Sequence, residues 1–212
     1  MTENIEVFTH SSIRIRTEAG NVYVDPFRMR EAPADADLIL VTHDHYDHFS
    51  PDDIRKVAGE DCVLVVPEKM LARAEEAGDA VREIRSVVPG AAYEIRGLKF
   101  ETLPAYNALK PFHPKSAGWV GYVIEAGGRR VYVAGDTDAT KEAEAVACDV
   151  ALVPVGGTYT MNAKKAAELI NRIRPACAIP THYGGIVGSP EDAEVFAAAV
   201  KPPVAVEIKM QY

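Results

Sequence analysis

Short apolar runs recur along the chain, and each ends near a polar or small residue. They cover residues 22–24, 38–41, 63–66, 131–134, 150–153 and 176–179. Continuous runs of this length, rich in β-branched residues, are typical of strands buried on both faces of a sheet. Residues 13–16 alternate isoleucine and arginine instead, which predicts a half-exposed antiparallel strand.

Stretches between these runs carry helix-start signals. Ser50 and Ser189 each precede a proline and two acidic residues, so both serines are predicted to cap helices. Asn162 is predicted to cap a helix over residues 163–172, whose apolar side chains fall on one face. Buried strands with helices between them favour an α/β sandwich, with the sheets inside and the helices outside.

Two segments repeat one arrangement. Thr42 and Thr181 are each followed directly by a histidine and, eight positions after the threonine, by one of the two predicted capping serines. The repeat is either a coincidence between two ordinary helix caps or the sign of a two-half architecture. In the second case, the loops of both halves meet at one site.

Length and composition fit a single domain over residues 1–212. The chain has 212 residues, 48% of them hydrophobic, which is enough to bury a substantial core. The amino terminus lacks the pattern of a secretion signal, and no apolar stretch is long enough to span a bilayer. The three cysteines, Cys62, Cys148 and Cys177, are odd in number and widely spaced. They indicate buried thiols in a reducing compartment, so we expect a cytoplasmic protein.

The net charge of -8 argues against a nucleic acid as partner, because phosphate backbones require a basic face. A small-molecule substrate, anionic or not, remains compatible with this charge, since bound metal ions would supply their own positive charge. A homo-oligomer is also compatible with the sequence.

Residues 43–48 contain three histidines and two aspartates directly after an apolar run. If the extended geometry of the strand persists, alternation points His43 and His45 the same way, while Asp47 and His48 aim at a second point. Imidazole nitrogens and carboxylate oxygens are preferred ligands of zinc and related ions. A histidine-rich surface loop is the alternative, but the spacing favours a metal site.

The run His-x-His-x-Asp-His resembles the signature of the metallo-β-lactamase superfamily of metal-dependent hydrolases. Residues 134–137 and 180–184 are similar to later motifs of that superfamily. Residues 9–12 and 22–26 resemble the opening of the branch that contains ascorbate-phosphate lactonases and the phospholipase D acting on N-acyl-phosphatidylethanolamine. The resemblance covers nearly the whole chain and implies a four-layer αββα sandwich.

The same resemblance implies a ligand set. His43 and His45 would bind a first metal, Asp47, His48 and His182 a second, and Asp136 would bridge both. One or two zinc ions are expected, with manganese, iron or nickel as the other candidates. Bound zinc lowers the pKa of water to about 7 and so provides a nucleophile at neutral pH. Asp47 is also a candidate catalytic residue.

The chain departs from the branch pattern after Pro104 and Ala105, where Asn107 stands in place of a first-metal histidine. An amide oxygen is a weaker zinc ligand than imidazole. We therefore predict that His113, six residues downstream, compensates for Asn107 as a ligand or through a hydrogen bond. The alternatives are a catalytic proton donor, a substrate-binding lid residue and an ordinary surface histidine.

Further candidates surround this set. Asp25 resembles an aspartate that orients ligand histidines, and His10 resembles an early histidine near the site. Tyr106 and Tyr159 are candidate substrate-binding residues, although the glycines before Tyr159 also fit a simple turn into the next helix.

The expected function is metal-dependent hydrolysis of an ester, lactone or phosphodiester. An iron-dependent oxidoreductase of the same fold is one alternative, because the ligand types overlap. A non-catalytic metal-binding protein is the other.

Overall fold

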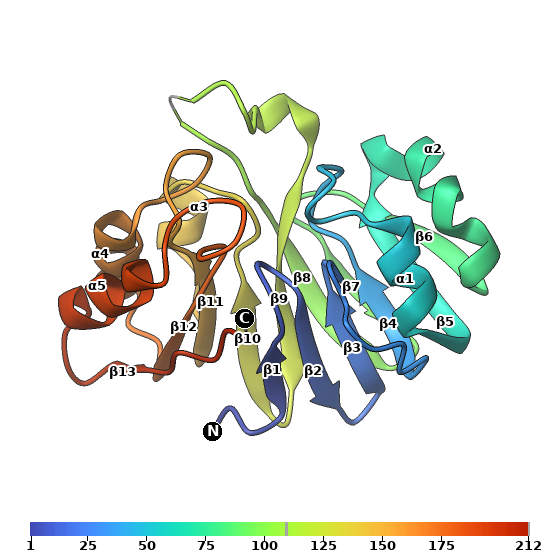
Figure 1. Ribbon diagram of the computed structural model, residues 1–212, viewed down its shortest axis with the longest axis horizontal. Helices are drawn as coiled ribbons and strands as arrows, with labels where there is room; N and C mark the ends of the chain where they lie inside the picture. Colours follow the sequence, from blue (N-terminus) through green and yellow to red (C-terminus); the bar gives the residue numbers. More distant parts are fainter. Residues whose placement is uncertain (109, 212) are drawn as a thin grey trace.

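The computed structural model describes residues 1–108 and 110–211 and contains two sheets with helices outside them (Figure 1). The first sheet has the strand order β1-β2-β3-β4-β5-β6. Its strands are β1 (Ile5–Val7), β2 (Ile13–Thr17), β3 (Gly20–Val24), β4 (Ala36–Leu40), β5 (Ala58–Pro67) and β6 (Glu83–Val87). The second sheet has the order β13-β12-β11-β10-β9-β8-β7. Its strands are β7 (Ala92–Ile95), β8 (Leu98–Pro104), β9 (Val120–Ala126), β10 (Arg129–Val133), β11 (Val150–Pro154), β12 (Cys177–Thr181) and β13 (Ala205–Val206).

Helices connect many of these strands. The α-helices are α1 (Pro51–Val57), α2 (Leu71–Ala74), α3 (Lys141–Glu144), α4 (Ala163–Ile173) and α5 (Glu191–Ala199). Short 3-10 helices are η1 (Glu68–Met70), η2 (Glu75–Ala80) and η3 (Lys115–Ala117). Figure 1 shows α1 and α2 outside the first sheet and α4 and α5 outside the second.

Strand β4 shows how the layers are joined. Leu38 and Leu40 are buried in the core that the two sheets share, whereas Ile39 points the opposite way and packs in the cluster that contains Ile54 of α1. This alternation buries both faces of the strand, as its unbroken apolar run predicts. The αββα sandwich expected from the sequence is confirmed.

The predicted strands are also confirmed. Three of the six apolar runs lie wholly on strands, and the other three extend one residue beyond a strand. Residues 13–16 lie in β2, which pairs antiparallel with β1 and β3. Strands β3 to β6 are parallel to one another, and so are β10 to β13. Loops after parallel strands leave at the same edge of a sheet, which is where the candidate ligands lie.

Two of the three predicted helix caps are confirmed. Ser50 accepts a hydrogen bond from the Asp53 backbone, and Asn162 accepts one from Lys165. The prediction for Ser189 was wrong, because α5 begins at Glu191 and its cap position is Pro190. Pro190 already has helical backbone angles, so the serine lies one residue too early to cap.

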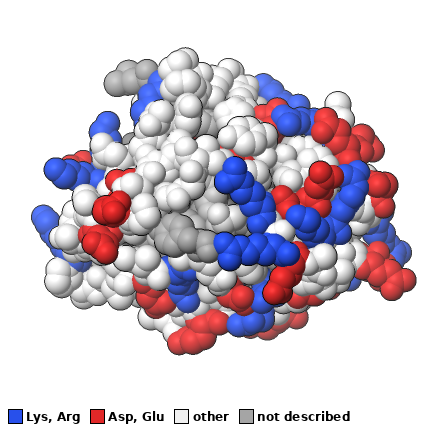
Figure 2. All heavy atoms as spheres, in the orientation of Figure 1, with Lys and Arg blue, Asp and Glu red and all other residues white. Residues whose placement is uncertain are grey.

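Acidic and basic side chains are intermixed on the face seen in Figure 2. Among the described residues, no helix is long and apolar enough to cross a membrane. The three cysteines are free thiols, with Cys62 and Cys177 buried and Cys148 partly buried.

Candidate metal centre

The candidate ligands come from loops of both sheets. His43, His45, Asp47 and His48 lie between β4 and α1, whereas Asp136 follows β10 and His182 follows β12. The extended geometry suggested for residues 43–45 is not present, because β4 ends at Leu40. The chain turns instead: the backbone N–H groups of His48 and Phe49 both donate to the His45 carbonyl, at 3.0 and 2.8 Å.

A close contact between the sheets brings these loops together. The Val120 N–H donates to the Thr42 carbonyl over 3.1 Å. Gly135 lies against Thr42, and a β-carbon there would be 3.1 Å from the threonine Cβ. Gly135 also has a φ of +64°, which favours glycine. Gly135, the residue before Asp136, is therefore suited to a close approach between the loops of the two sheets.

The first ligand group contains His43, His45 and His113, whose donor nitrogens lie within 4.8 Å of one another. His43 Nε2 and His45 Nδ1 are 3.2 Å apart. The His113 ring lies 5.2 Å from that of His43 and 4.9 Å from that of His45, between centroids. The loop between β8 and β9 thus delivers His113 to the two histidines assigned to the first metal.

The second group contains His10, Asp47, His48 and His182, all buried and with donor atoms within 4.8 Å of one another. Asp47 Oδ2 lies 3.9 Å from both His48 Nε2 and His182 Nε2. His10 Nε2 is closer, 3.0 Å from the same oxygen. His10 therefore belongs to the second group and contacts Asp47 directly.

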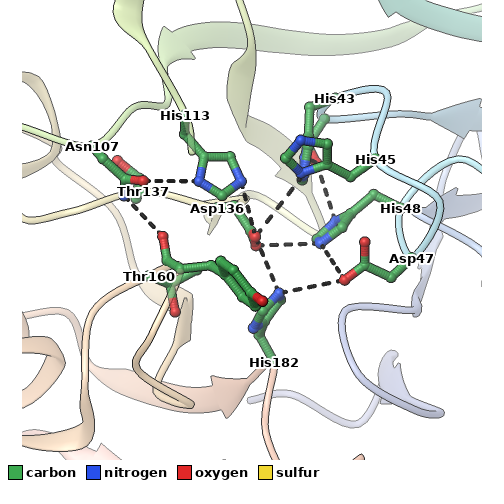
Figure 3. Close-up of polar contacts among 12 residues, drawn as sticks. His43, His45, Asp47, His48, Asn107, His113, Asp136, Thr137, Thr160 and His182 are labelled. Carbon is green, nitrogen blue, oxygen red and sulfur yellow. Dashed lines mark hydrogen bonds and ion pairs between the residues drawn. The ribbon is translucent and has the colours of Figure 1, made fainter. Parts of the chain in front are cut away.

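Asp136 lies between the groups (Figure 3). Its Oδ2 is 3.3 Å from His113 Nε2 and 3.1 Å from His182 Nε2, and its Oδ1 is 3.3 Å from His48 Nε2. The distance to His43 Nε2 is 4.0 Å. One carboxylate thus faces both groups, as a bridging ligand must.

Four of the candidate ligand atoms lack hydrogen-bond partners among the described residues. His48 Nε2, His113 Nε2, His182 Nε2 and Asp136 Oδ1 are all buried, and they face one another only as close ionic contacts. Burial of several unpaired polar atoms is costly, and here they converge on one another. Because their chemistry is that of preferred zinc ligands, these residues fit one or two divalent ions.

The remaining nitrogens of three histidines are held by hydrogen bonds, and for His43 the partner of Nδ1 is the Thr42 hydroxyl at 2.9 Å. Asp25 lies 2.7 Å from His48 Nδ1 and accepts hydrogen bonds from the Thr42 hydroxyl at 2.6 Å and the Thr42 N–H at 2.8 Å. Asn107 Oδ1 lies 2.9 Å from His113 Nδ1. A proton held on Nδ1 leaves Nε2 free to bind a metal. The structure thus places Asn107 behind His113.

Three residues of the centre have left-handed backbone conformations. The φ angles of His10, Asp25 and His182 are 56°, 47° and 57°. This region is unfavourable for residues other than glycine, and such conformations cluster at functional sites. The His182 N–H donates to the His10 carbonyl over 2.8 Å, and their rings lie 3.9 Å apart. The two strained residues therefore support each other.

The buried charges of the centre offset one another. Burial raises the pKa of the Asp136 carboxyl, but the charges of His182 and His48 outweigh this effect and hold it well below its usual value. Burial lowers the pKa of His48, whereas Asp136 and Asp25 raise it well above its usual value. Burial likewise raises the pKa of Asp47, yet the hydrogen bond from His10 and the charge of His48 bring it to about 2. Both pKa shifts favour the anionic carboxylate, which is the form that binds metal ions.

The two tyrosines predicted to bind substrate, Tyr106 and Tyr159, have different environments. Tyr106 donates to Glu142 over 2.8 Å and lies under the Lys115 ammonium, which is 4.7 Å from the ring centroid. Tyr159 is exposed and lies in the turn before α4, where the Gly157 N–H donates to the Met161 carbonyl. The simple turn considered for this segment is therefore present, with the Tyr159 ring on its surface.

Two residues near the centre were not predicted from the sequence as site residues. Thr42 donates hydrogen bonds to Asp25, and its position directly before His43 could have indicated this role. Trp119 lies with its ring 5.0, 4.8 and 5.4 Å from those of His43, His45 and His113. The only feature of the sequence that could have drawn attention to Trp119 is that it is the single tryptophan of the chain.

Comparison with known proteins agrees with this architecture. The family model of the beta-lactamase superfamily domain matches residues 4–182. The chain therefore belongs to the metallo-β-lactamase superfamily. It is 31% identical to a UPF0173 metal-dependent hydrolase of Methanopyrus kandleri over 208 residues, which cover 91% of this chain and 89% of that relative. It is 35% identical to a UPF0173 metal-dependent hydrolase of Thermoplasma acidophilum over 190 residues, covering 84% and 82%.

Among solved structures, a Parabacteroides distasonis protein named as a metal-dependent hydrolase superposes with a TM-score of 0.81. It is 28% identical, and the match covers 98% of this chain and 93% of that one. The superfamily predicted from the motifs is confirmed. The lactonase and phospholipase branch stays a prediction.

Proposed function

We propose that this protein is a metal-dependent hydrolase that cleaves an ester, lactone or phosphodiester bond with the centre around Asp136. The observation that carries the proposal is the convergence of buried ligand nitrogens from three other loops, those of His48, His113 and His182, onto this carboxylate. The names of the UPF0173 relatives support metal-dependent hydrolysis. Zinc suits the mixed imidazole and carboxylate set best, and manganese, iron and nickel are the competing ions.

Each ligand group would hold one ion. His43, His45 and His113 would bind the first, Asp47, His48 and His182 the second, and Asp136 both. Ions bound there would act as Lewis acids that activate water and polarise the scissile bond. His113 is better placed as a ligand than as a proton donor, because Nε2 faces Asp136 and Nδ1 is engaged by Asn107.

Residues around the candidate ligands orient the ligand side chains. Asp25 and Thr42 orient His48, and Asn107 orients His113. His10 positions the Asp47 carboxylate. These contacts hold ligand rings in one geometry before a substrate arrives, which reduces the cost of reorganisation during the reaction.

A substrate panel tests this proposal. Protein stripped of metal and reloaded with zinc, manganese or iron would be assayed on an aryl ester, a simple lactone and bis-nitrophenyl phosphate. We expect hydrolysis that needs metal and rises with pH toward neutrality. Activity on the panel that persists fully in chelator would contradict the proposal.

Asp136→Ala should remove the shared ligand, lower the metal content measured by elemental analysis and abolish turnover. Asp149→Ala is the matched control, because Asp149 accepts a hydrogen bond from the Arg130 N–H at the opposite end of β10. Full metal content in Asp136→Ala would show that this residue does not bridge. Oxygen uptake by the iron form without hydrolysis would favour an oxidoreductase. One metal per chain without any turnover would favour a non-catalytic protein.

A further inference from the structure

Exposed aromatic rings gather beside the candidate centre. Among the described residues, the exposed large hydrophobic side chains include three aromatic ones, Tyr46, Phe112 and Tyr159, with exposed fractions of 61%, 43% and 37%. Two of them are neighbours of candidate ligands in the chain: Tyr46 lies between His45 and Asp47, and Phe112 precedes His113. A cluster of exposed apolar side chains at one place on a surface commonly marks a binding site.

Two of these rings contact each other from different loops. Phe112 and Tyr159 meet edge to face, with centroids 4.8 Å apart and planes at 86°. The Tyr159 carbonyl also accepts a hydrogen bond of 3.0 Å from the Asn107 amide, which in turn bonds His113. The ring pair is therefore fixed relative to the first ligand group.

Further rings line the centre itself. Trp119, which is partly exposed, contacts the three histidines of the first group. On the other side, Tyr46 packs against Phe27 with centroids 6.1 Å apart, and Phe27 lies 6.2 Å from His10. Aromatic surface thus borders both ligand groups.

The lysines of the β8–β9 loop are already paired. Lys110 Nζ lies 3.0 Å from Asp138 and 2.5 Å from the Thr160 carbonyl, and Lys115 Nζ lies 2.7 Å from Glu142. Their charges are therefore largely neutralised. In Figure 2 this loop, at the top of the view, shows mostly uncharged atoms.

We infer that the substrate is an uncharged ester or lactone that carries an aromatic or extended apolar group, bound against Phe112, Tyr159 and Trp119. This inference rests on the proposed hydrolase function and narrows it away from phosphodiesters. In the reaction, the oxygen of water bonds to the carbonyl carbon, the acyl carbon–oxygen bond breaks, and the alcohol leaves with a proton. The rings would stack against the apolar group and so orient the carbonyl toward Asp136 and the candidate ligands around it.

The test compares three ethyl esters that share one leaving group: ethyl phenylacetate, ethyl acetate and monoethyl succinate. We expect kcat/KM for ethyl phenylacetate to exceed the other two by about tenfold or more. Phe112→Ala and Tyr159→Ala should each reduce that preference several-fold, mainly through KM. Tyr159→Phe keeps the ring and should keep the preference. Ile208→Ala, which truncates an exposed apolar residue near the carboxyl terminus, is the control for general surface effects.

Equal kcat/KM for the three esters, or a preference for monoethyl succinate, would overturn the inference and leave the hydrolase function standing. Binding is measured separately with 4-phenyl-2-butanone, a ketone that cannot be hydrolysed, through the fluorescence of Trp119. Saturable binding that is lost in Phe112→Ala and Tyr159→Ala, without metal-dependent hydrolysis of these esters, a lactone or bis-nitrophenyl phosphate, would support the ring site and overturn the proposed hydrolase. Absence of ketone binding to the metal-loaded protein would overturn the ring site.

Discussion

Replacement of Asn107 by alanine should weaken metal binding at the first ligand group without removing any ligand. The Asn107 amide has one orientation that satisfies both neighbours: Nδ2 donates to the Tyr159 carbonyl, and Oδ1 accepts from His113 Nδ1. Asn107 and His113 are only 6% and 1% exposed, so water cannot readily replace the lost acceptor. The alanine variant leaves the Nδ1–H of His113 without its partner and the ring free to rotate.

The size of the effect follows from these contacts. An unpaired buried donor costs about 1–3 kcal/mol. Loss of a hydrogen-bond partner behind a metal ligand typically reduces metal affinity about 10–100-fold, which corresponds to about 1.4–2.7 kcal/mol. The two ranges agree, so we expect the dissociation constant of one ion to rise by about one to two orders of magnitude. The affinity of the second ion should change much less.

The assay is a zinc titration of metal-stripped protein against a competing chelator, followed by the fluorescence of Trp119. Asn171→Ala is the matched control, because Asn171 also makes two hydrogen bonds, to the Ala199 carbonyl and the Lys201 N–H, far along the chain. It should lose stability but keep wild-type metal affinity. Wild-type zinc affinity in Asn107→Ala would refute the reasoning, and so would an equal loss in both variants.

Two further predictions concern stability. Ser50→Ala should lower the free energy of unfolding by about 1 kcal/mol, because it removes the cap of α1, whereas Ser189→Ala should lower it clearly less. Urea unfolding of both variants measures these losses, and equal losses would contradict the cap assignment. The hydrogen bond from Lys115 lowers the pKa of Glu142 from 4.5 to about 2, so the stabilising contribution of this pair is complete above about pH 4.5 and is lost as the pH falls toward 2. The stability difference between wild type and Glu142→Gln should therefore be smaller at pH 3.5 than at pH 6.5, and a difference independent of pH would show that the pair does not contribute.

Much of the fold could be predicted because its signals are local. A strand buried on both faces must be apolar throughout. Runs such as residues 38–41 and 150–153 can therefore be recognised as strands without knowing which strands pair with them. The ligand residues were also accessible, since loops after parallel strands converge at one edge. The predicted cap at Ser189 failed because a one-residue shift in where α5 begins depends on backbone angles that sequence does not display.

The role of Asn107 and the place of His113 were harder to derive. The loop between β8 and β9 is positioned by contacts with distant segments, among them Asn107 with Tyr159 and Lys115 with Glu142. Such pairings depend on the folded arrangement of three loops, and no periodic pattern in the sequence predicts them. Sequence reasoning could therefore propose that His113 reaches the first group but could not distinguish a ligand from a lid residue.

The position of Asp136 between ligands of the two sheets has a consequence for the amount of protein in a cell. An ion held by His43 from one half and Asp136 from the other binds only when both halves are assembled. Each ion bound at the proposed site would stabilise the folded state, by about 2.7 kcal/mol at a free concentration one hundred times its dissociation constant. Scarcity of metal would enlarge the unfolded fraction that proteases remove. Metal supply would thus set the lifetime of the chain as well as its activity.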